Sequence, residues 1–87
     1  MNQLWYLYMV RCRNNSLYTG ITTDVKRRFT EHTVQKNKCA KYLRGKAPLV
    51  LVYVDLVGSY SVALTLERYV KRLSKSAKEK LIAVNKF

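Results

Sequence analysis

The chain has 87 residues, in which 17 Lys and Arg stand against five Asp and Glu, so the formal net charge is +12. A field of one sign attracts polyanions, so we expect nucleic acid, and DNA first, as the partner. The apolar fraction of 48% excludes a disordered basic tail, and the length predicts one domain over residues 1–87.

The first two elements predict a β-hairpin. Residues 4–12 are apolar and aromatic at both alternating sets of positions, which indicates a strand covered on both faces. Residues 13–16 predict a turn, because Asn tolerates a left-handed backbone. Residues 17–22 predict a second short strand, which completes the hairpin.

A helix and a lysine-rich segment follow the hairpin. Thr22, Thr23 or Asp24 can cap a helix that runs to about Thr33. Three of its side chains recur at helical spacing: Val25, Phe29 and His32. Residues 34–47 are polar and rich in lysine, and we expect a helical turn within residues 40–44.

The second half of the chain predicts a strand and two helices. Residues 48–55 are the strongest strand, and Gly58 and Ser59 break it. A helix is expected over residues 61–73. Its inward positions are Val62, Ala63, Leu66, Tyr69, Val70 and Leu73. Residues 76–79 read as a capping box for a last helix that buries Ala77, Leu81 and Val84.

The element order β-β-α-β-α-α predicts a small α/β (α+β) fold, with about three helices covering a three-stranded sheet. No apolar stretch reaches the length of a membrane span, so no membrane is expected as a partner. Cys12 and Cys39 are too far apart in sequence for a zinc half-site, and two free thiols fit a reducing cytoplasm. The chain carries no P-loop or dinucleotide turn, so we expect no small-molecule cofactor.

A spaced set of residues resembles the GIY-YIG nuclease superfamily. Tyr6-Leu7-Tyr8 is followed ten residues later by the run LYTGIT at residues 17–22, and then by Arg28, His32 and Glu67. The resemblance covers essentially the whole chain. It is close to the small single-domain bacterial members of the YhbQ type, which carry the same LYTGITTDV-x-RR run. The fold it implies is a three-stranded antiparallel sheet flanked by helices.

The resemblance also implies a divalent-metal-dependent endonuclease and roles for the matching residues. Glu67 would hold a single Mg²⁺ or Mn²⁺, and one carboxylate suffices because Mg²⁺ keeps waters and takes phosphate oxygens. Arg28 would neutralise charge on the scissile phosphate. Tyr8 or Tyr18 would remove a proton from the attacking water, with His32 assisting.

The residue pattern by itself leaves alternatives open. His32 could contact a phosphate, act as a general base or cap its own helix. Glu67 could simply form an ion pair with Lys71, and Arg28 could be one more solvated arginine. The alternative function is a non-catalytic basic DNA- or RNA-binding module of the same fold, with tyrosines that stack on bases.

Basic side chains near the motif are candidate nucleic-acid contacts. They are Arg27, Lys38, Lys41, Arg44 and Lys46. Gly20 is a further candidate, because a glycine there either lets a ligand approach the backbone or marks a bulge. Arg27 points further out than Arg28 and can pair with Glu31.

The candidate site requires a hairpin loop of a particular length. A two-residue turn at Asn14-Asn15 would put Tyr8 and Tyr18 on opposite faces of the sheet. A loop of odd length, or a bulge, brings both hydroxyls to one face. We therefore expect an odd loop or a bulge, with Tyr8, Tyr18, Arg28, His32 and Glu67 converging on one concave face.

The chain departs from the family pattern after the glycine and beyond the glutamate. Ile21 stands where some members have a lysine, and Glu79 stands where many have an asparagine. Without a further DNA-binding domain, we expect cutting that depends on DNA structure, as in repair or processing, and not on sequence. The five scattered acids exclude a two-metal nuclease, and one histidine excludes a two-histidine mechanism.

Overall fold

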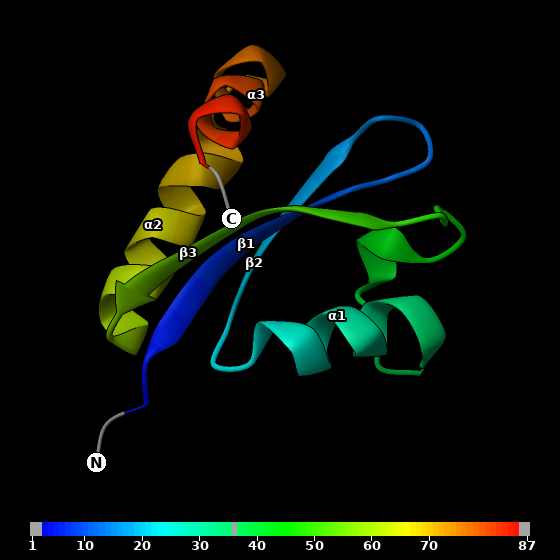
Figure 1. Ribbon diagram of the computed structural model, residues 1–87, viewed down its shortest axis with the longest axis horizontal. Coiled ribbons are helices and arrows are strands. Elements are labelled where there is room, and N and C mark those ends of the chain that lie inside the picture. Colours follow the sequence, from blue (N-terminus) through cyan, green and yellow to red (C-terminus); the bar gives the residue numbers. More distant parts are fainter. Residues whose placement is uncertain (1–2, 36, 86–87) are drawn as a thin grey trace.

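The computed structural model describes residues 3–35 and 37–85. These residues form seven elements: β1 (Trp5–Arg11), β2 (Leu17–Thr22), α1 (Val25–Val34), the 3-10 turn η1 (Lys41–Leu43), β3 (Val50–Gly58), α2 (Tyr60–Arg72) and α3 (Lys75–Val84). The strands form one antiparallel sheet in the order β2-β1-β3 (Figure 1). The α/β class, the antiparallel sheet and the element order are as expected. No helix within the described residues is long and apolar enough to cross a membrane.

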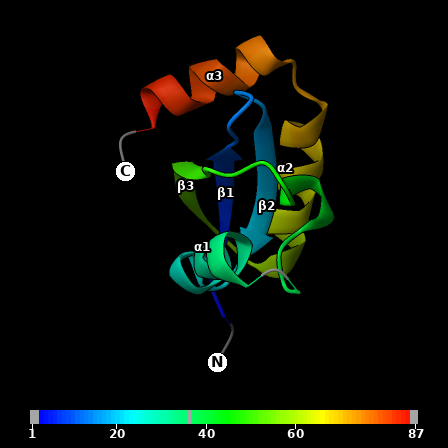
Figure 2. The ribbon, with the colours of Figure 1, turned by 90° about the vertical axis from the view of Figure 1, so that its right-hand side faces the viewer.

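Helices cover the two faces of the sheet, with α1 and η1 on one side and α2 and α3 on the other (Figures 1 and 2). One buried cluster contains Tyr8, Val10, Cys12, Cys39 and Leu43. The other contains Leu7, Met9, Tyr53 and Val70. The central strand β1 supplies alternate residues to both clusters, which explains why its sequence is apolar throughout.

The hairpin between β1 and β2 has a three-residue loop, residues 13–15. The Cys12 amide donates to the Ser16 carbonyl, and the Asn15 amide donates to the Cys12 carbonyl, both at 2.9 Å. Asn15 has a φ of 70°, the left-handed conformation that such a loop needs and that Asn tolerates.

This loop sets the register of the hairpin. Tyr8 pairs with Gly20, and Val10 pairs with Tyr18. Since side chains alternate between faces, Tyr8 and Tyr18 lie on the same face of the sheet. The expectation of an odd loop is confirmed, and the pairing runs without a bulge through Gly20.

Helix α1 begins where one of the three candidate caps predicted. The side chain of Asp24 accepts a hydrogen bond from the Arg27 amide at 3.0 Å, which pairs one of the free amides of the first turn. Val25 and Phe29 pack against the sheet, and His32 is buried. Helix α1 therefore presents His32 to the face that carries the two tyrosines.

Helix α2 is rotated relative to the expected orientation. Val62 and Tyr69 were expected to point inward, but they are 46% and 62% exposed, while Ala63 and Val70 are buried. Neighbouring residues differ by about 100° around a helix, so a stripe centred on Ala63 and Val70 leaves the preceding residues outside. The same rotation carries Glu67, four residues after Ala63, onto the inward stripe.

The end of β3 and the cap of α3 also differ from expectation. Strand β3 continues to Gly58, beyond the expected end at residue 55. Helix α3 is capped by Ser74, whose hydroxyl accepts from the Ala77 amide at 3.1 Å, so a capping box at residues 76–79 is wrong. Glu79 instead accepts two hydrogen bonds from Arg11, both at 2.7 Å. Val84, expected inside, is 77% exposed.

Candidate active site

Two tyrosines and the histidine form a tight group on the α1 side of the sheet. The ring centroids of Tyr8 and Tyr18 are 6.3 Å apart, and those of Tyr18 and His32 are 5.6 Å apart in an edge-on arrangement. Tyr8 is only 1% exposed, whereas Tyr18 is half-buried. The hairpin register and the spacing along α1 thus bring together three of the residues that the sequence selected.

The hydrogen bonds of His32 define which ring nitrogen carries the proton. The Ala40 amide donates to Nδ1 at 3.3 Å, so Nδ1 is an acceptor. In a neutral imidazole the other nitrogen, Nε2, then carries the hydrogen. Nε2 lies 2.8 Å from the hydroxyl oxygen of Tyr8, so His32 donates to Tyr8. Both ring nitrogens have partners within the protein, and His32 does not cap its helix.

The site shifts the pKa values of both partners. Burial, followed by the nearby Arg28 cation, lowers the pKa of His32 from 6.5 to about 4, so the ring is neutral at neutral pH. Burial raises the pKa of Tyr8 above its ordinary value, and Tyr18 adds to the effect. Arg28 acts in the opposite direction, and the negative charge of Glu67 raises the pKa further. Arg28 and Glu67 therefore both act electrostatically on Tyr8.

Arg28 is held by two acceptors. Its Nη1 donates to Glu31 Oε1 at 2.8 Å and to the Lys38 carbonyl at 2.7 Å. Glu31 is buried and also accepts from Arg27 at 3.4 Å. A guanidinium has five N–H donors, and both of these contacts use Nη1. Glu31 and the Lys38 carbonyl thus fix the orientation of the guanidinium through Nη1.

Glu67 lies on the inward stripe of α2, and its side chain is 16% exposed. It forms the ion pair with Lys71 that the spacing allows, at 3.4 Å. Within residues 3–35 and 37–85, no three His, Cys, Asp or Glu side chains gather into a metal-binding cluster. A single partly accessible carboxylate fits a hard cation that keeps its waters and takes oxygens from a substrate.

Gly20 has a packing role that the sequence did not specify. A Cβ atom at this position would lie 2.5 Å from the Tyr8 hydroxyl oxygen and 2.6 Å from Tyr8 Cζ. The glycine leaves room for the Tyr8 side chain to cross β2 and reach His32. Gly20 is buried under that ring, so it does not contribute to an accessible nucleic-acid-binding surface.

The basic candidates around the site differ in their surroundings. Lys38, Lys41 and Arg44 are exposed, whereas Lys46 is half-buried with its ammonium 3.4 Å from the centre of the Tyr42 ring. Tyr42 in turn stacks on Tyr18 at 5.9 Å.

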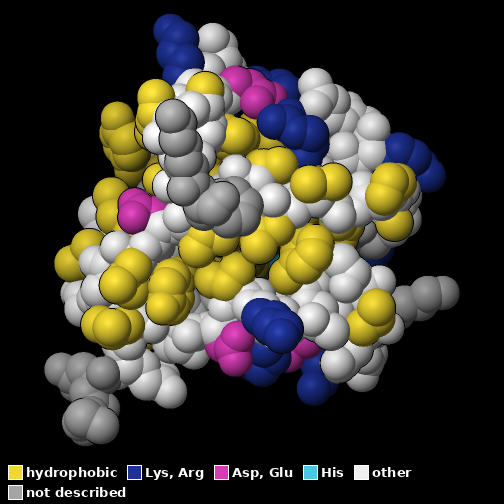
Figure 3. Space-filling view, viewed as in Figure 1, with side chains coloured by type: hydrophobic (Ala, Val, Ile, Leu, Met, Phe, Trp, Pro, Cys, Tyr) yellow, Lys and Arg dark blue, Asp and Glu magenta, His cyan; other side chains and the backbone are white. Residues whose placement is uncertain are grey.

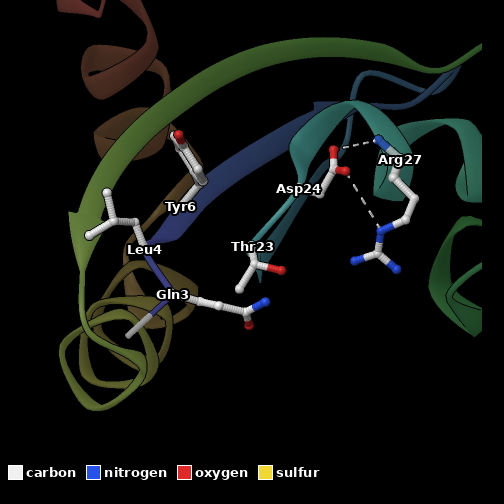
Figure 4. Close-up of a pocket in the computed structure, with 6 residues that line it drawn as sticks. All are labelled: Gln3, Leu4, Tyr6, Thr23, Asp24 and Arg27. Carbon is white, nitrogen blue, oxygen red and sulfur yellow. Dashed lines mark hydrogen bonds and ion pairs between the residues drawn. The ribbon is translucent and has the colours of Figure 1, made fainter. Parts of the chain in front are cut away.

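Arg27 lies at a separate cavity of about 520 Å³ (Figure 4). Asp24 and Arg27 lie side by side there, with 4.0 Å between Asp24 Oδ2 and Arg27 Nε. Tyr6 lines the same cavity. Arg27 also forms an ion pair with Glu31, so two of the five acids, Asp24 and Glu31, offset its charge. Arg27 is therefore a weaker anion contact than Arg28.

The face viewed in Figure 3 does not gather the positive charge. Hydrophobic side chains spread across its middle, and Lys and Arg side chains are scattered around them. This face therefore lacks the continuous basic surface expected for nucleic-acid contact.

Cys39 and His32 do not form a catalytic pair. Both line a cavity of about 860 Å³, but the two ring nitrogens of His32 are engaged by Tyr8 and Ala40. Cys39 is 8% exposed, and its Sγ donates to the Ala40 carbonyl at 3.4 Å. Cys12 is also free and buried.

Two tyrosines, a histidine and an arginine lie together on the α1 side of the three-stranded antiparallel sheet, whereas Glu67 lies on α2, which covers the other side. The model of the GIY-YIG catalytic domain matches residues 4–80, and the chain belongs to this family. A UPF0213 protein of Vibrio cholerae is 56% identical over 80 residues, which cover 91% of this chain and 77% of the relative. The UPF0213 protein YhbQ of Escherichia coli is 53% identical over 79 residues, with the same two coverages.

Two solved structures share the fold. The solution NMR structure of a UPF0213 protein from Bacillus halodurans is 41% identical, with a TM-score of 0.59. The match covers 93% of this chain and 84% of the Bacillus halodurans chain. An NMR structure of a protein from E. faecalis is 31% identical, with a TM-score of 0.63, and the match covers 91% of this chain and 82% of the other.

Sequence reasoning missed two residues at the site. Glu31 was assigned to Arg27 alone, but it also holds Arg28. Tyr42 was not selected, although it covers Tyr18. The only signal for Tyr42 was an aromatic residue inside a lysine-rich segment, and nothing in its spacing predicted contact with β2.

Proposed function

We propose that this chain is a divalent-metal-dependent endonuclease that hydrolyses phosphodiester bonds, with DNA as the first candidate substrate. The observation that carries the proposal is the group around Tyr8: a hydrogen bond from His32 and a neighbouring phenol at Tyr18, with Arg28 and Glu67 shifting the pKa of Tyr8 in opposite directions. These are the residue types that phosphodiester hydrolysis needs, namely a base, a cation for the phosphate and a carboxylate for a metal ion.

Tyr18 is the better candidate for the general base. Two adjacent phenols do not ionise together, because the first negative charge disfavours the second. Burial keeps Tyr8 protonated, and Tyr8 is almost fully enclosed, whereas Tyr18 is only half-buried. Tyr8 and His32 then serve to hold the ring of Tyr18 in place.

Arg28 is the residue proposed to bind the scissile phosphate. Glu31 and the Lys38 carbonyl fix the direction of its guanidinium before any substrate arrives. A fixed cation loses little entropy when it neutralises the charge that builds in the transition state.

Glu67 is the proposed ligand for Mg²⁺ or Mn²⁺. Its carboxylate is mostly buried on the inward stripe of α2, and it would exchange its contact with Lys71 for the ion. A bound divalent ion would stabilise negative charge on the phosphate and on the departing 3′ oxygen.

A cleavage panel tests this function. End-labelled single-stranded, flapped, branched and blunt duplex DNA, with RNA of the same sequence, are incubated with the protein with and without Mg²⁺ or Mn²⁺. We expect cutting of at least one substrate only when the ion is present. If the protein binds these substrates but cuts none with any divalent ion, the nuclease proposal fails and a binding module remains.

A further inference from the structure

A row of three tyrosine rings leads from the centre of the site to the surface. Tyr8 is buried, Tyr18 is half-buried and Tyr42 is 44% exposed. The successive ring centroids are 6.3 Å and 5.9 Å apart, and the planes of Tyr18 and Tyr42 are 28° apart. The last ring is thus stacked on a residue of the site while it remains open to solvent.

The ring of Tyr42 carries a cation at its face. The ammonium of Lys46 lies 3.4 Å from the ring centroid. A cation over an aromatic face at the protein surface is held weakly, whereas a stacked nucleobase binds such a ring more strongly. A base can therefore displace the ammonium.

The backbone around Lys46 is anchored, so the side chain can move alone. The Lys46 carbonyl accepts from the Arg13 amide at 2.9 Å, and its amide donates to the Leu43 carbonyl at 3.2 Å. Leu43, beside Tyr42 in η1, is 2% exposed and fixes this turn in the core. The ring and the lysine are held at one place at the edge of the site.

We propose that Tyr42 stacks an unpaired nucleobase next to the phosphate bound in the site, and that Lys46 leaves the ring to contact the backbone of the same strand. This proposal rests on the proposed function and adds a substrate class to it. Stacking on a protein ring needs a base whose face is free, which single strands and flaps offer and an intact duplex does not. The residue therefore selects unpaired nucleic acid.

The test compares Tyr42→Ala with two controls. Tyr42→Phe keeps the ring, and Tyr69→Ala removes a tyrosine that is 62% exposed on α2, away from the row. Dissociation constants are measured for a labelled single-stranded DNA, the RNA of the same sequence and a blunt duplex, over a series of salt concentrations.

We expect Tyr42→Ala to weaken single-strand binding by ~5- to 100-fold at every salt concentration, because a stack is lost while the charges remain. The slope of log affinity against log salt stays unchanged, and duplex binding stays within about twofold. Tyr42→Phe and Tyr69→Ala bind like the wild type. Lys46→Met, in contrast, lowers the slope by about 0.7, the value for one phosphate contact on a single strand. The DNA and RNA arms show which backbone is preferred.

Tyr42→Trp gives an independent readout if Tyr42→Ala does not fold. In a Trp5→Phe background, the emission of the new tryptophan should be quenched on titration with single-stranded DNA and not with duplex. Equal binding by Tyr42→Ala and wild type, equal losses on single strand and duplex, or an unquenched tryptophan would overturn the role of Tyr42. A wild type that binds none of the oligonucleotides would overturn the proposed function as well.

Discussion

His32 donates a hydrogen bond from Nε2 to the hydroxyl oxygen of Tyr8 at 2.8 Å, and the two residues lie 24 positions apart in the chain. The direction of this bond is set at the other side of the ring, where Nδ1 accepts from the Ala40 amide. A protonated ring would point a second N–H at that amide. The pair is therefore built for a neutral histidine.

Protonation of His32 should destabilise the fold. Its pKa is about 4 in the folded protein and 6.5 when unfolded, so the unfolded chain binds the proton first as pH falls. The stability that depends on a neutral His32 is fully present above pH 6.5. It is lost as pH falls from 6.5 to about 4, by about 3 kcal/mol in total. Thermal unfolding measured from pH 8 to pH 4 checks this. His32→Gln should remove the decrease in this window, and a persistent decrease in that variant would assign it to other groups.

The pH dependence of cleavage should follow a phenol and not the histidine. Since His32 is neutral throughout the range from pH 5 to 8, the rate should show no inflection near pH 6.5. Tyr18→Phe should reduce kcat by about a hundredfold or more while DNA binding persists. Tyr8→Phe should reduce it less and should mainly lower stability, because the Nε2 hydrogen of His32 loses its acceptor. The reverse order of these two variants would make Tyr8 the base.

Replacement of Gly20 by alanine should push against the Tyr8 ring and lower the stability of the fold. A glycine-to-alanine change in a strand is ordinarily neutral or favourable, but here the added methyl group meets the Tyr8 ring at 2.5–2.9 Å. We expect a loss of about 1–3 kcal/mol in the free energy of unfolding from this overpacking. Urea denaturation measures it. In a Tyr8→Ala background the same change should cost almost nothing, and an undiminished cost there would contradict the clash.

The contact between Arg11 and Glu79 should connect α3 to the hairpin. Two hydrogen bonds of 2.7 Å join these side chains, and Lys75 lies against the same carboxylate. The bonds to Arg11 and then to Lys75 lower the pKa of Glu79 to about 2, so this contribution is present above pH 4.5 and is lost as pH falls toward 2.

The Arg11–Glu79 pair is partly exposed, so solvent screening reduces its effect to about 1 kcal/mol. A double-mutant cycle with Arg11→Met and Glu79→Gln at pH 7 measures the coupling, and Lys75→Met serves as the control for the helix pair alone. Strictly additive losses would show that the two side chains do not interact.

The sequence predicted the fold and the position of both tyrosines and His32 on one face of the sheet, because these depend on short-range patterns. The alternation in β1, the odd hairpin loop and the helical spacing from Val25 to His32 each follow from local rules. Helix α2 was placed correctly, but its rotation was not, since an apolar stripe with Val62 and Tyr69 at its margin fits two orientations.

The sequence could not predict the contacts made by the lysine-rich segment. The Lys38 carbonyl meets Arg28 and the Ala40 amide meets His32, because residues 37–47 return across the end of α1. That path has no periodic pattern. Tyr42 lies on Tyr18 for the same reason. The prediction for the cap of α3 was wrong for another reason. Ser74 and Ser76 are both suitable capping residues, and Glu79 binds Arg11 and does not complete a capping box with Ser76.

The cleavage assay of Glu67→Gln, compared with Lys71→Met, tests the central claim most directly. Both substitutions break the ion pair between α2 residues 67 and 71, but only the first removes the carboxylate. If Glu67 holds the ion, Glu67→Gln should lose metal-dependent cutting by at least about a hundredfold, while DNA binding persists or tightens and the thermal midpoint stays close to that of the wild type. Lys71→Met should still cut. A wild type that cuts and a Glu67→Gln variant that cuts equally well would contradict the account.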